Sequence, residues 1–331
     1  MKRVLVTGGA GFIGSNIAGT LADFTDYRVV VVDQFGSDDK WRNLSKHRIY
    51  EIISPGEVFY WLEANKSELD AIIHMGAISS TTEHNVDLIL ETNFTFSRGL
   101  WNWAAQNKKR FIYASSAATY GAGEEGFDDN GSLDALSKLK PLNAYGWSKH
   151  LFDQFVATAT SGLHDKVPSQ WVGLKFFNVY GPNEYHKGLQ SSVVEQIYPH
   201  AKYGRPVKLF KSYRPDYKDG GQLRDFVYVK DCVRVLVWLL GTPGVSGLFN
   251  LGTGKARSFA DLAAATFAAV GKAPTIQYID MPDDIRGKYQ YFTQAETKRL
   301  QDAGYNEPFF SLEDGVKDYV QNYLGKDDQY F

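Results

Sequence analysis

The chain has 331 residues, of which 44% are hydrophobic and 22% are charged, and its formal net charge is −2. This composition excludes a mostly disordered chain, and the near-zero charge excludes a large basic surface for nucleic acid or an anionic membrane. The length favours two lobes over a single core. No apolar run approaches the ~20 residues that a membrane-spanning helix needs, and no signal peptide precedes the first strand, so we expect a cytoplasmic protein.

Short apolar runs alternate with helical patterns through the first half of the chain. "SNIAGTLADF" and "NVDLILETNFTFSRGLWNWAAQN" have helical spacing, and the runs around them are β-branched or aromatic, as in parallel strands buried on both faces. The expected strands are residues 3–8, 28–33, 71–76, 110–116 and 171–179. Repeated units of this kind predict an α/β fold with a doubly wound parallel sheet of the Rossmann type.

After about residue 180 the elements become shorter, and Pro, Gly, Tyr and Lys become frequent. "RDFVYV" and "GLFNLGTG" indicate further strands on either side of a helix, and a last helix is expected near 311–324. We therefore predict a dinucleotide-binding domain of residues 1–178 and 225–256, with a smaller α/β substrate domain of residues 179–224 and 257–331. The one cysteine, Cys232, lies in the intervening helix, where we expect an inert buried thiol. No metal site is expected.

A glycine-rich segment, "VLVTGGAGFIGSNIAGTL", follows the first strand and opens a helix. Gly8, Gly11 and Gly14 are spaced three apart, which permits a tight turn and lets a pyrophosphate approach the backbone at the helix N-terminus. Asp33 closes the next strand, 19 residues beyond Gly14. This spacing predicts a dinucleotide site rather than an ordinary glycine-rich turn.

The choice of dinucleotide depends on the residues after the second strand. A carboxylate at Asp33 favours NAD, because it accepts from a ribose 2′-hydroxyl and repels a 2′-phosphate. Lys40 and Arg42 follow in the same connection and can supply the cation that NADP needs. These residues leave NAD and NADP open.

Two further motifs place hydroxyl and amine groups at the ligand edge of the sheet. Ser116 lies in "YASSAATYG" at the end of the fourth strand, and Tyr145 and Lys149 are four residues apart in "NAYGWSK". Alone, the serine would end a strand and the tyrosine–lysine pair would be a solvated helix face. Together with the glycine motif they indicate catalysis.

The chemistry follows from the pKa of the phenol, ordinarily ~10. A neighbouring ammonium and a positive nicotinamide ring lower this pKa, and a shift of ~3 units corresponds to ~4 kcal/mol. Tyr145 can then take a proton from a substrate hydroxyl while hydride leaves the carbon for a nicotinamide. In this interpretation Lys149 also holds the nicotinamide ribose, and Ser116 bonds the substrate oxygen.

"TGGAGFIGSN", "YASSAATYG", "YGWSK", "FFNVYGP" and "RDFVYV" resemble the extended short-chain dehydrogenases/reductases that modify nucleotide sugars. Dehydratases of that class carry an acidic pair where this chain has Ala117 and Ala118, so dehydration is not expected. "GAISSTTE", "LKFFNVYGPNEYHKG", "FNLGTGKARSF" and "GKYQYFTQA" extend the resemblance over almost the whole chain, to the ADP-L-glycero-D-manno-heptose 6-epimerase family.

This resemblance implies an NADP-dependent isomerase that acts on an ADP-heptose-type nucleotide sugar. The family oxidises heptose C6 and reduces the ketone from its other face, and the product feeds the inner core of lipopolysaccharide. A homo-oligomer is expected as well.

The resemblance also implies roles for individual residues. Lys187, in "NEYHKG", is a second acid–base group, Asn178 bonds the substrate and Arg224 clamps its diphosphate. Taken alone, these would be a solvated lysine, a turn residue and the partner of an ion pair with Asp225. The further implied substrate contacts are Phe210, Lys211, Ser212, Tyr213 and Tyr289. The further implied cofactor contacts are Phe12, Ile13, Gln34, Gly76, Ala77, Ser79, Asn93 and Val179, in addition to Asp33 and Lys40.

The chain departs from the family pattern at several positions. Met75 replaces a glutamate and "SPGEV" lacks a lysine expected near the far end of the cofactor, which keeps NAD as the alternative to NADP. Leu189 and Gln196 replace a serine and a histidine that contact substrate, and the loop "SYRPDYKDGGQ" is longer than usual. A UDP- or GDP-sugar epimerase or reductase is therefore the alternative enzyme, and a cofactor-sensing protein without catalysis is the alternative from another class.

Overall fold

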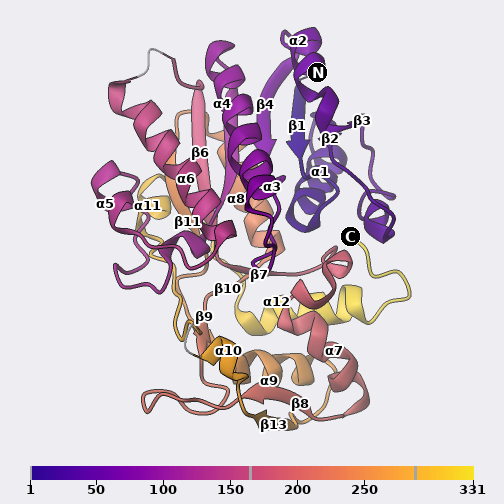
Figure 1. The fold of residues 1–331 in the computed structure, drawn as a ribbon. Helices are drawn as coiled ribbons and strands as arrows, with labels where there is room; N and C mark the ends of the chain where they lie inside the picture. The colour runs from indigo at the N-terminus through magenta and orange to yellow at the C-terminus, as the bar shows by residue number, and fades with distance from the viewer. Residues whose placement is uncertain (1, 164–165, 287–288) are drawn as a thin grey trace.

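The computed structural model describes residues 2–163, 166–286 and 289–331. In this part of the chain, seven parallel strands form the central sheet in the order β11-β6-β5-β4-β1-β2-β3 (Figure 1). These strands are β1 (Arg3–Thr7), β2 (Arg28–Val32), β3 (Glu51–Ile53), β4 (Leu69–His74), β5 (Arg110–Ser116), β6 (Gln170–Phe176) and β11 (Gly247–Leu251). The order reverses at β1, so the predicted doubly wound parallel sheet is confirmed, and its ligand crevice is expected between the carboxyl ends of β1 and β4.

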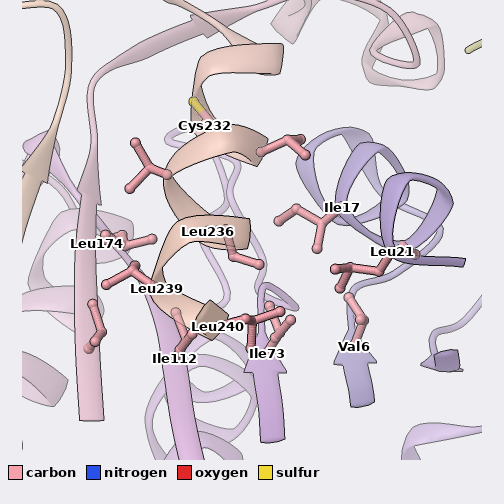
Figure 2. Packing of buried hydrophobic residues seen from close by; sticks show 14 of the residues in the cluster. Val6, Ile17, Leu21, Ile73, Ile112, Leu174, Cys232, Leu236, Leu239 and Leu240 are labelled. Carbon is pink, nitrogen blue, oxygen red and sulfur yellow. The ribbon is translucent and has the colours of Figure 1, made fainter. Parts of the chain in front are cut away.

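One face of the sheet is covered by α1 (Phe12–Phe24) and α8 (Val229–Gly241). Figure 2 shows Ile17 and Leu21 of α1 over Val6, and Leu236 of α8 in the same cluster. These strands are buried on both faces, which explains their continuous runs of valine and isoleucine. Cys232 of α8 is 1% exposed, and burial raises the pKa of its thiol, as expected of an inert cysteine.

The opposite face is covered by α2 (Val58–Asn65), α4 (Phe96–Gln106) and α6 (Ala144–Thr158). Trp101 of α4 packs edge-on against Phe111 of β5, which in turn contacts Phe152 of α6. The helix expected over 85–107 forms as α3 (Val86–Leu90), one π-helical turn at η3 (Glu91–Thr95), and α4. Single π-helical turns are frequent at functional sites.

The smaller lobe lies beyond the carboxyl ends of the strands, in the lower part of Figure 1. Two apolar clusters hold it together, one of them reaching Phe12 of α1. Leu300 and Tyr305, from a segment expected in this lobe, pack instead into the cluster on the sheet. The elements of this half of the chain are β7 (Asn178–Tyr180), η6 (Tyr185–Gln190), α7 (Val193–Tyr203), β8 (Val207–Phe210), β9 (Leu223–Arg224), β10 (Phe226–Tyr228), β12 (Arg257–Ser258), α9 (Phe259–Ala269), β13 (Ile276–Ile279), α10 (Asp283–Arg286), α11 (Lys298–Asp302), α12 (Leu312–Tyr319) and η7 (Val320–Leu324).

Two details differ from the expected strands. The run 171–179 is broken at Phe177, whose N–H donates to Leu251 O at 3.1 Å, so β6 ends in the sheet and β7 begins a separate pair with β10. The short strands β3 and β8 were not anticipated, because runs of three or four residues carry little periodicity.

The remaining short elements are η1 (Asp39–Asn43), η2 (Pro55–Glu57), η4 (Ala117–Tyr120), α5 (Leu133–Lys138) and η5 (Ala159–Leu163). Among the helices described, none is long and apolar enough to span a membrane.

Candidate active site

The glycine loop between β1 and α1 is a tight turn that leaves no room for side chains. Gly8 has φ +64°, and a Cβ on Gly14 would lie 2.0 Å from Gly8 O. Gly11 caps α1 without a side-chain hydrogen bond, so the first N–H groups of the helix remain available to an anion. This cradle fits the pyrophosphate of a dinucleotide, with Phe12 and Ile13 in the first turn beside it.

Asp33 and Lys40 lie together at the end of β2. The carboxylate of Asp33 accepts from Ala10 N at 2.8 Å, which ties it to the glycine loop, and from Gln34 N at 2.7 Å. Lys40 Nζ lies 2.6 Å from Asp33 Oδ1 and donates to Gln34 O at 2.9 Å. The site thus presents both the acceptor for a ribose 2′-hydroxyl and a cation for a 2′-phosphate. Arg42 instead lies over the ring of Tyr330, at 4.7 Å from its centroid.

The segment after β4 passes very close to the glycine loop. A Cβ on Gly8 would lie 2.6 Å from Gly76 Cα, and Gly76 N donates to Thr7 Oγ1 at 3.1 Å. Gly76 and Ala77 are half-buried and Ser79 is exposed, so this segment forms one wall of the crevice.

Asn93 lies behind that wall, in the π-helical turn η3, and is 1% exposed. Its amide accepts from Ile78 N at 2.8 Å and donates to Ile78 O at 3.0 Å and to Ser148 Oγ at 3.0 Å. Both N–H groups of Asn93 are therefore used within the protein, and they fix the 76–79 segment against α6. Val179, the other expected cofactor contact of the second half, is half-buried on β7.

A buried histidine that sequence reasoning missed joins these parts. His74 Nε2 lies 2.7 Å from Ser97 Oγ, and the Ser97 hydroxyl donates to Asn93 O, so the imidazole must donate through Nε2. Its Nδ1 therefore accepts from the hydroxyl of Thr7, at 2.6 Å. Burial, and then the charge of Lys149, lower the pKa of His74 to about 3, so the ring is neutral. A polar residue in the apolar run "AIIHMG" was the signal in the sequence.

The serine and the tyrosine are brought together at the carboxyl end of β5. Ser116 ends that strand and caps η4, its Oγ accepting from Ala118 N at 3.1 Å. Asn143 caps α6, whose first turn carries Tyr145. The neighbouring Gly146 lets α6 approach η4 closely, because a Cβ there would lie 2.7 Å from Ala118 O.

Burial shifts the pKa of Tyr145 and that of Lys149, and the sequence did not indicate these shifts. Burial raises the pKa of the half-buried Tyr145, and a hydrogen bond with Ser116 lowers it by less. Burial also lowers the pKa of Lys149 to about 8, against the opposing charge of Asp153. Lys149 Nζ donates to Ala114 O at 2.9 Å, so one of its three N–H groups is directed at the strand. The groups of the chain thus make the phenol less acidic than an ordinary tyrosine, in contrast to the expected lowering of its pKa.

Lys187 is half-buried in η6 rather than solvated. Its Nζ lies 5.5 Å from the ring centroid of Phe12, beside the first turn of α1. Burial lowers the pKa of Lys187, while Glu184 raises it. Leu189 and Gln196, which depart from the family pattern nearby, differ in their surroundings. The side chain of Leu189 is 94% exposed, whereas that of Gln196 donates to Ser191 O at 2.8 Å.

Arg224, in β9, is a buried cation without an ion-pair partner among the described residues. Its guanidinium lies between Phe259 and Tyr289, at 5.7 and 5.3 Å from their centroids, and donates to Leu223 O and Gln290 O. The alternative ion pair with Asp225 does not form. Asp225 instead accepts from Thr253 and from backbone N–H groups of residues 253, 254 and 295.

The other residues expected to contact the substrate lie in β8, in the loop after it and in β7. The ring of Phe210 is 6.2 Å from that of Tyr289. Lys211 Nζ and Tyr213 OH both contact Asp280, at 3.1 and 3.0 Å. Ser212 N donates to Asp219 Oδ1 at 2.7 Å and so closes the long loop on itself. Asn178 is exposed at the start of β7. The first two residues of the motif "GKYQYFTQA", 287–288, lie outside the described residues.

Comparison with known proteins identifies the relatives of this chain. Residues 4–252 match the model of the NAD dependent epimerase/dehydratase family. ADP-L-glycero-D-manno-heptose-6-epimerase of Fusobacterium nucleatum is 47% identical over 335 residues, with 99% of each chain covered. The Helicobacter pylori enzyme of the same name has a solved structure with a TM-score of 0.80 and 32% identity, covering 97% of this chain and 96% of that one. A structure of MoeE5 with UDP-glucose and NAD is 26% identical, with a TM-score of 0.73 and coverage of 95% and 96%. The chain therefore belongs to the ADP-L-glycero-D-manno-heptose-6-epimerase family of NAD dependent epimerases and dehydratases.

Proposed function

We propose that this chain is an ADP-glyceromanno-heptose 6-epimerase, which interconverts the D-glycero and L-glycero forms of ADP-D-manno-heptose for the lipopolysaccharide inner core. The observation that carries this proposal is the placement of Ser116, Tyr145 and Lys149 beside a dinucleotide cradle, in a chain whose full-length relatives bear that activity. Inversion of one carbinol centre requires that the centre be oxidised to a ketone and that hydride then return to the opposite face of that ketone.

The residues present fit a nicotinamide dinucleotide, and we propose NADP. Gly8, Gly11 and Gly14 would hold its pyrophosphate, and Lys40 would pair with a 2′-phosphate at Asp33. When bound, the cofactor supplies reversible hydride transfer, and its oxidised form carries a positive charge. That charge and the ammonium of Lys149 offset the burial that raises the pKa of Tyr145.

Tyr145 removes the proton from the C6 hydroxyl of one epimer, and Ser116 bonds the same oxygen. Lys187 serves the hydroxyl of the other epimer, because one fixed base does not reach both faces of the carbonyl plane. Its lowered pKa supports this assignment, since a buried amine exchanges protons nearer neutral pH than a solvated one.

Arg224 supports the choice of a nucleotide sugar as substrate. Among the described residues, this buried guanidinium donates only to carbonyl groups, so its charge is not compensated there, and the diphosphate of ADP-heptose supplies two oxygens for it. Tyr289 and Phe210 provide apolar and aromatic surface on the same side.

The direct test combines two measurements on the purified chain. Denaturation should release NADP if the cofactor co-purifies, and incubation with ADP-heptose should yield the other C6 epimer. UDP-hexoses and GDP-hexoses serve as the comparison. Turnover of a UDP- or GDP-sugar without turnover of ADP-heptose would replace this function with the related epimerase or reductase. Absence of any turnover, with cofactor bound, would favour the cofactor-sensing alternative.

The second base has its own test. Lys187→Ala should lower the epimerisation rate by at least ~10²-fold, as is typical for loss of a general acid–base group. Lys166→Ala, on a separate segment before β6, is the matched control and should retain the wild-type rate. A near-normal rate in Lys187→Ala would remove this residue from the mechanism.

We also propose the division into two domains set out above, with 298–305 joining the sheet domain because Leu300 and Tyr305 pack there. The homo-oligomer and the cytoplasmic location stay predictions, and light scattering of the purified chain tests the first.

A further inference from the structure

A fully buried ion pair lies directly behind the candidate catalytic residues. Lys175 Nζ, from β6, is 2.7 Å from Asp153 Oδ2, from α6, and the two side chains are 1% and 0% exposed. Burial of two charges costs several kcal/mol before their attraction is counted, and apolar residues often replace such pairs without loss of stability. The pair therefore calls for a role other than stability.

The hydrogen bonds of this pair lead to the catalytic strand end. Asp153 accepts from Ser115 Oγ at 2.7 Å and from Tyr113 OH at 3.1 Å, both on β5. Lys175 donates to Thr119 Oγ1 at 2.6 Å, and the Thr119 hydroxyl donates to Ser116 O at 2.8 Å. Hydrogen bonds that start from both members of the pair thus fix the backbone around Ser116.

One member of the pair, Asp153, also acts on Lys149. Asp153 lies one turn beyond Lys149 on α6, and Lys149 Nζ donates to Ala114 O, next to the serine that bonds Asp153. Asp153 raises the pKa of Lys149 against the lowering by burial.

The other groups that face this region come from four elements. His74 on β4 is neutral, and His150 on α6 has its pKa lowered by burial. Tyr113 on β5 and Tyr120 on η4, whose ring centroid lies 4.8 Å from Lys175 Nζ, have their pKa raised well above the ordinary value by burial. Lys149 and the Asp153–Lys175 ion pair are therefore the charged groups of this cluster.

We propose that Asp153 and Lys175 are positioning residues for the reaction. Asp153 keeps Lys149 in its ammonium form, Lys175 limits how strongly it does so, and together they hold the Ser116 backbone in register with α6. This inference rests on the proposed role of Lys149 in supporting the phenolate of Tyr145. It predicts that the two members of one ion pair act on Lys149 with opposite sign. A pair that does not act on Lys149 would leave the pKa of Lys149 unchanged in both variants.

The test is the pKa of Lys149, read by NMR from its labelled ε-carbon, with the signal assigned by its absence in Lys149→Arg. Asp153→Asn should lower this pKa by ~1 unit, and Lys175→Gln, which keeps a donor toward Thr119, should raise it. The alkaline limb of the epimerisation rate should move to lower pH in the first variant and to higher pH in the second. Asp318→Asn, which breaks the partly exposed pair with Lys230, is the control and should leave Lys149 unchanged.

The double variant Asp153→Asn/Lys175→Gln removes both charges and keeps a polar amide at each position, so it should fold even where a single variant does not, and its Lys149 pKa should lie between those of the single variants. Shifts of the same sign in both single variants, no shift, or failure of all three proteins to fold would overturn the inference. The titration requires no turnover. An inactive wild-type chain would therefore contradict the proposed function, and the Lys149 titration would still decide this inference.

Discussion

Replacement of Gly14 by alanine should weaken dinucleotide binding, because the added methyl group would meet the backbone of the glycine loop. The new Cβ would lie 2.0 Å from Gly8 O and 2.8 Å from Gly8 C. The Gly8 carbonyl would have to move by roughly 1.5 Å to reach van der Waals distance. Gly8 itself has φ +64° and lies against Gly76, so it has little freedom to move. Overpacking of this kind costs ~1–3 kcal/mol, and each ~1.4 kcal/mol of lost binding free energy raises Kd tenfold.

Isothermal titration with NADP and with NAD measures this effect. We expect a Kd ~5- to 150-fold higher in Gly14→Ala and a lower thermal unfolding midpoint. Gly241→Ala, at the end of α8, is the matched control, because no atom lies within 4 Å of its added Cβ. It should bind as the wild type does. Wild-type affinity in Gly14→Ala would show that the close packing of this loop does not govern cofactor binding.

Three further outcomes follow from the geometry. Tyr145→Phe should keep dinucleotide affinity but lose ~10²–10⁴-fold in turnover, and turnover near the wild-type rate would refute its role as the base. Arg224→Lys keeps the charge but loses the planar fork, so the KM for ADP-heptose should rise while kcat changes little; an unchanged KM would place the diphosphate elsewhere. The pKa of His74 is lowered to about 3 in the folded chain, so its contribution to stability is present above its ordinary pKa of 6.5 and is lost as pH falls toward 3. Urea unfolding at pH 7 and pH 5 should therefore show a larger loss of stability in the wild type than in His74→Gln, and equal losses would contradict a neutral buried imidazole.

Local patterns were enough to predict the sheet and the dinucleotide cradle. The strand expected at 110–116 coincides with β5, because continuous apolar residues bounded by polar ones define a buried parallel strand. The contact of Asp33 with Lys40 was also foreseeable, since both lie within one short connection after β2.

Features that depend on tertiary burial could not be read from the sequence. Lys175 stands in the apolar run "WVGLKFF", and its partner Asp153 lies 22 positions away on another element, so no local pattern relates them. The rise in the pKa of Tyr145 by burial was not foreseen for the same reason, because the tyrosine–lysine spacing shows the cation but not the desolvation of the phenol.

Inversion of C6 of an ADP-heptose by transient oxidation leaves a record in the hydrogen attached to that carbon. The most direct measurement uses ADP-D-glycero-D-manno-heptose carrying deuterium at C6, with the product followed by proton NMR in ordinary water. We predict formation of the L-glycero epimer with the deuterium retained, because the hydrogen leaves C6 as hydride and returns to the same carbon. Exchange of the label with solvent, or no inversion at C6, would contradict the account.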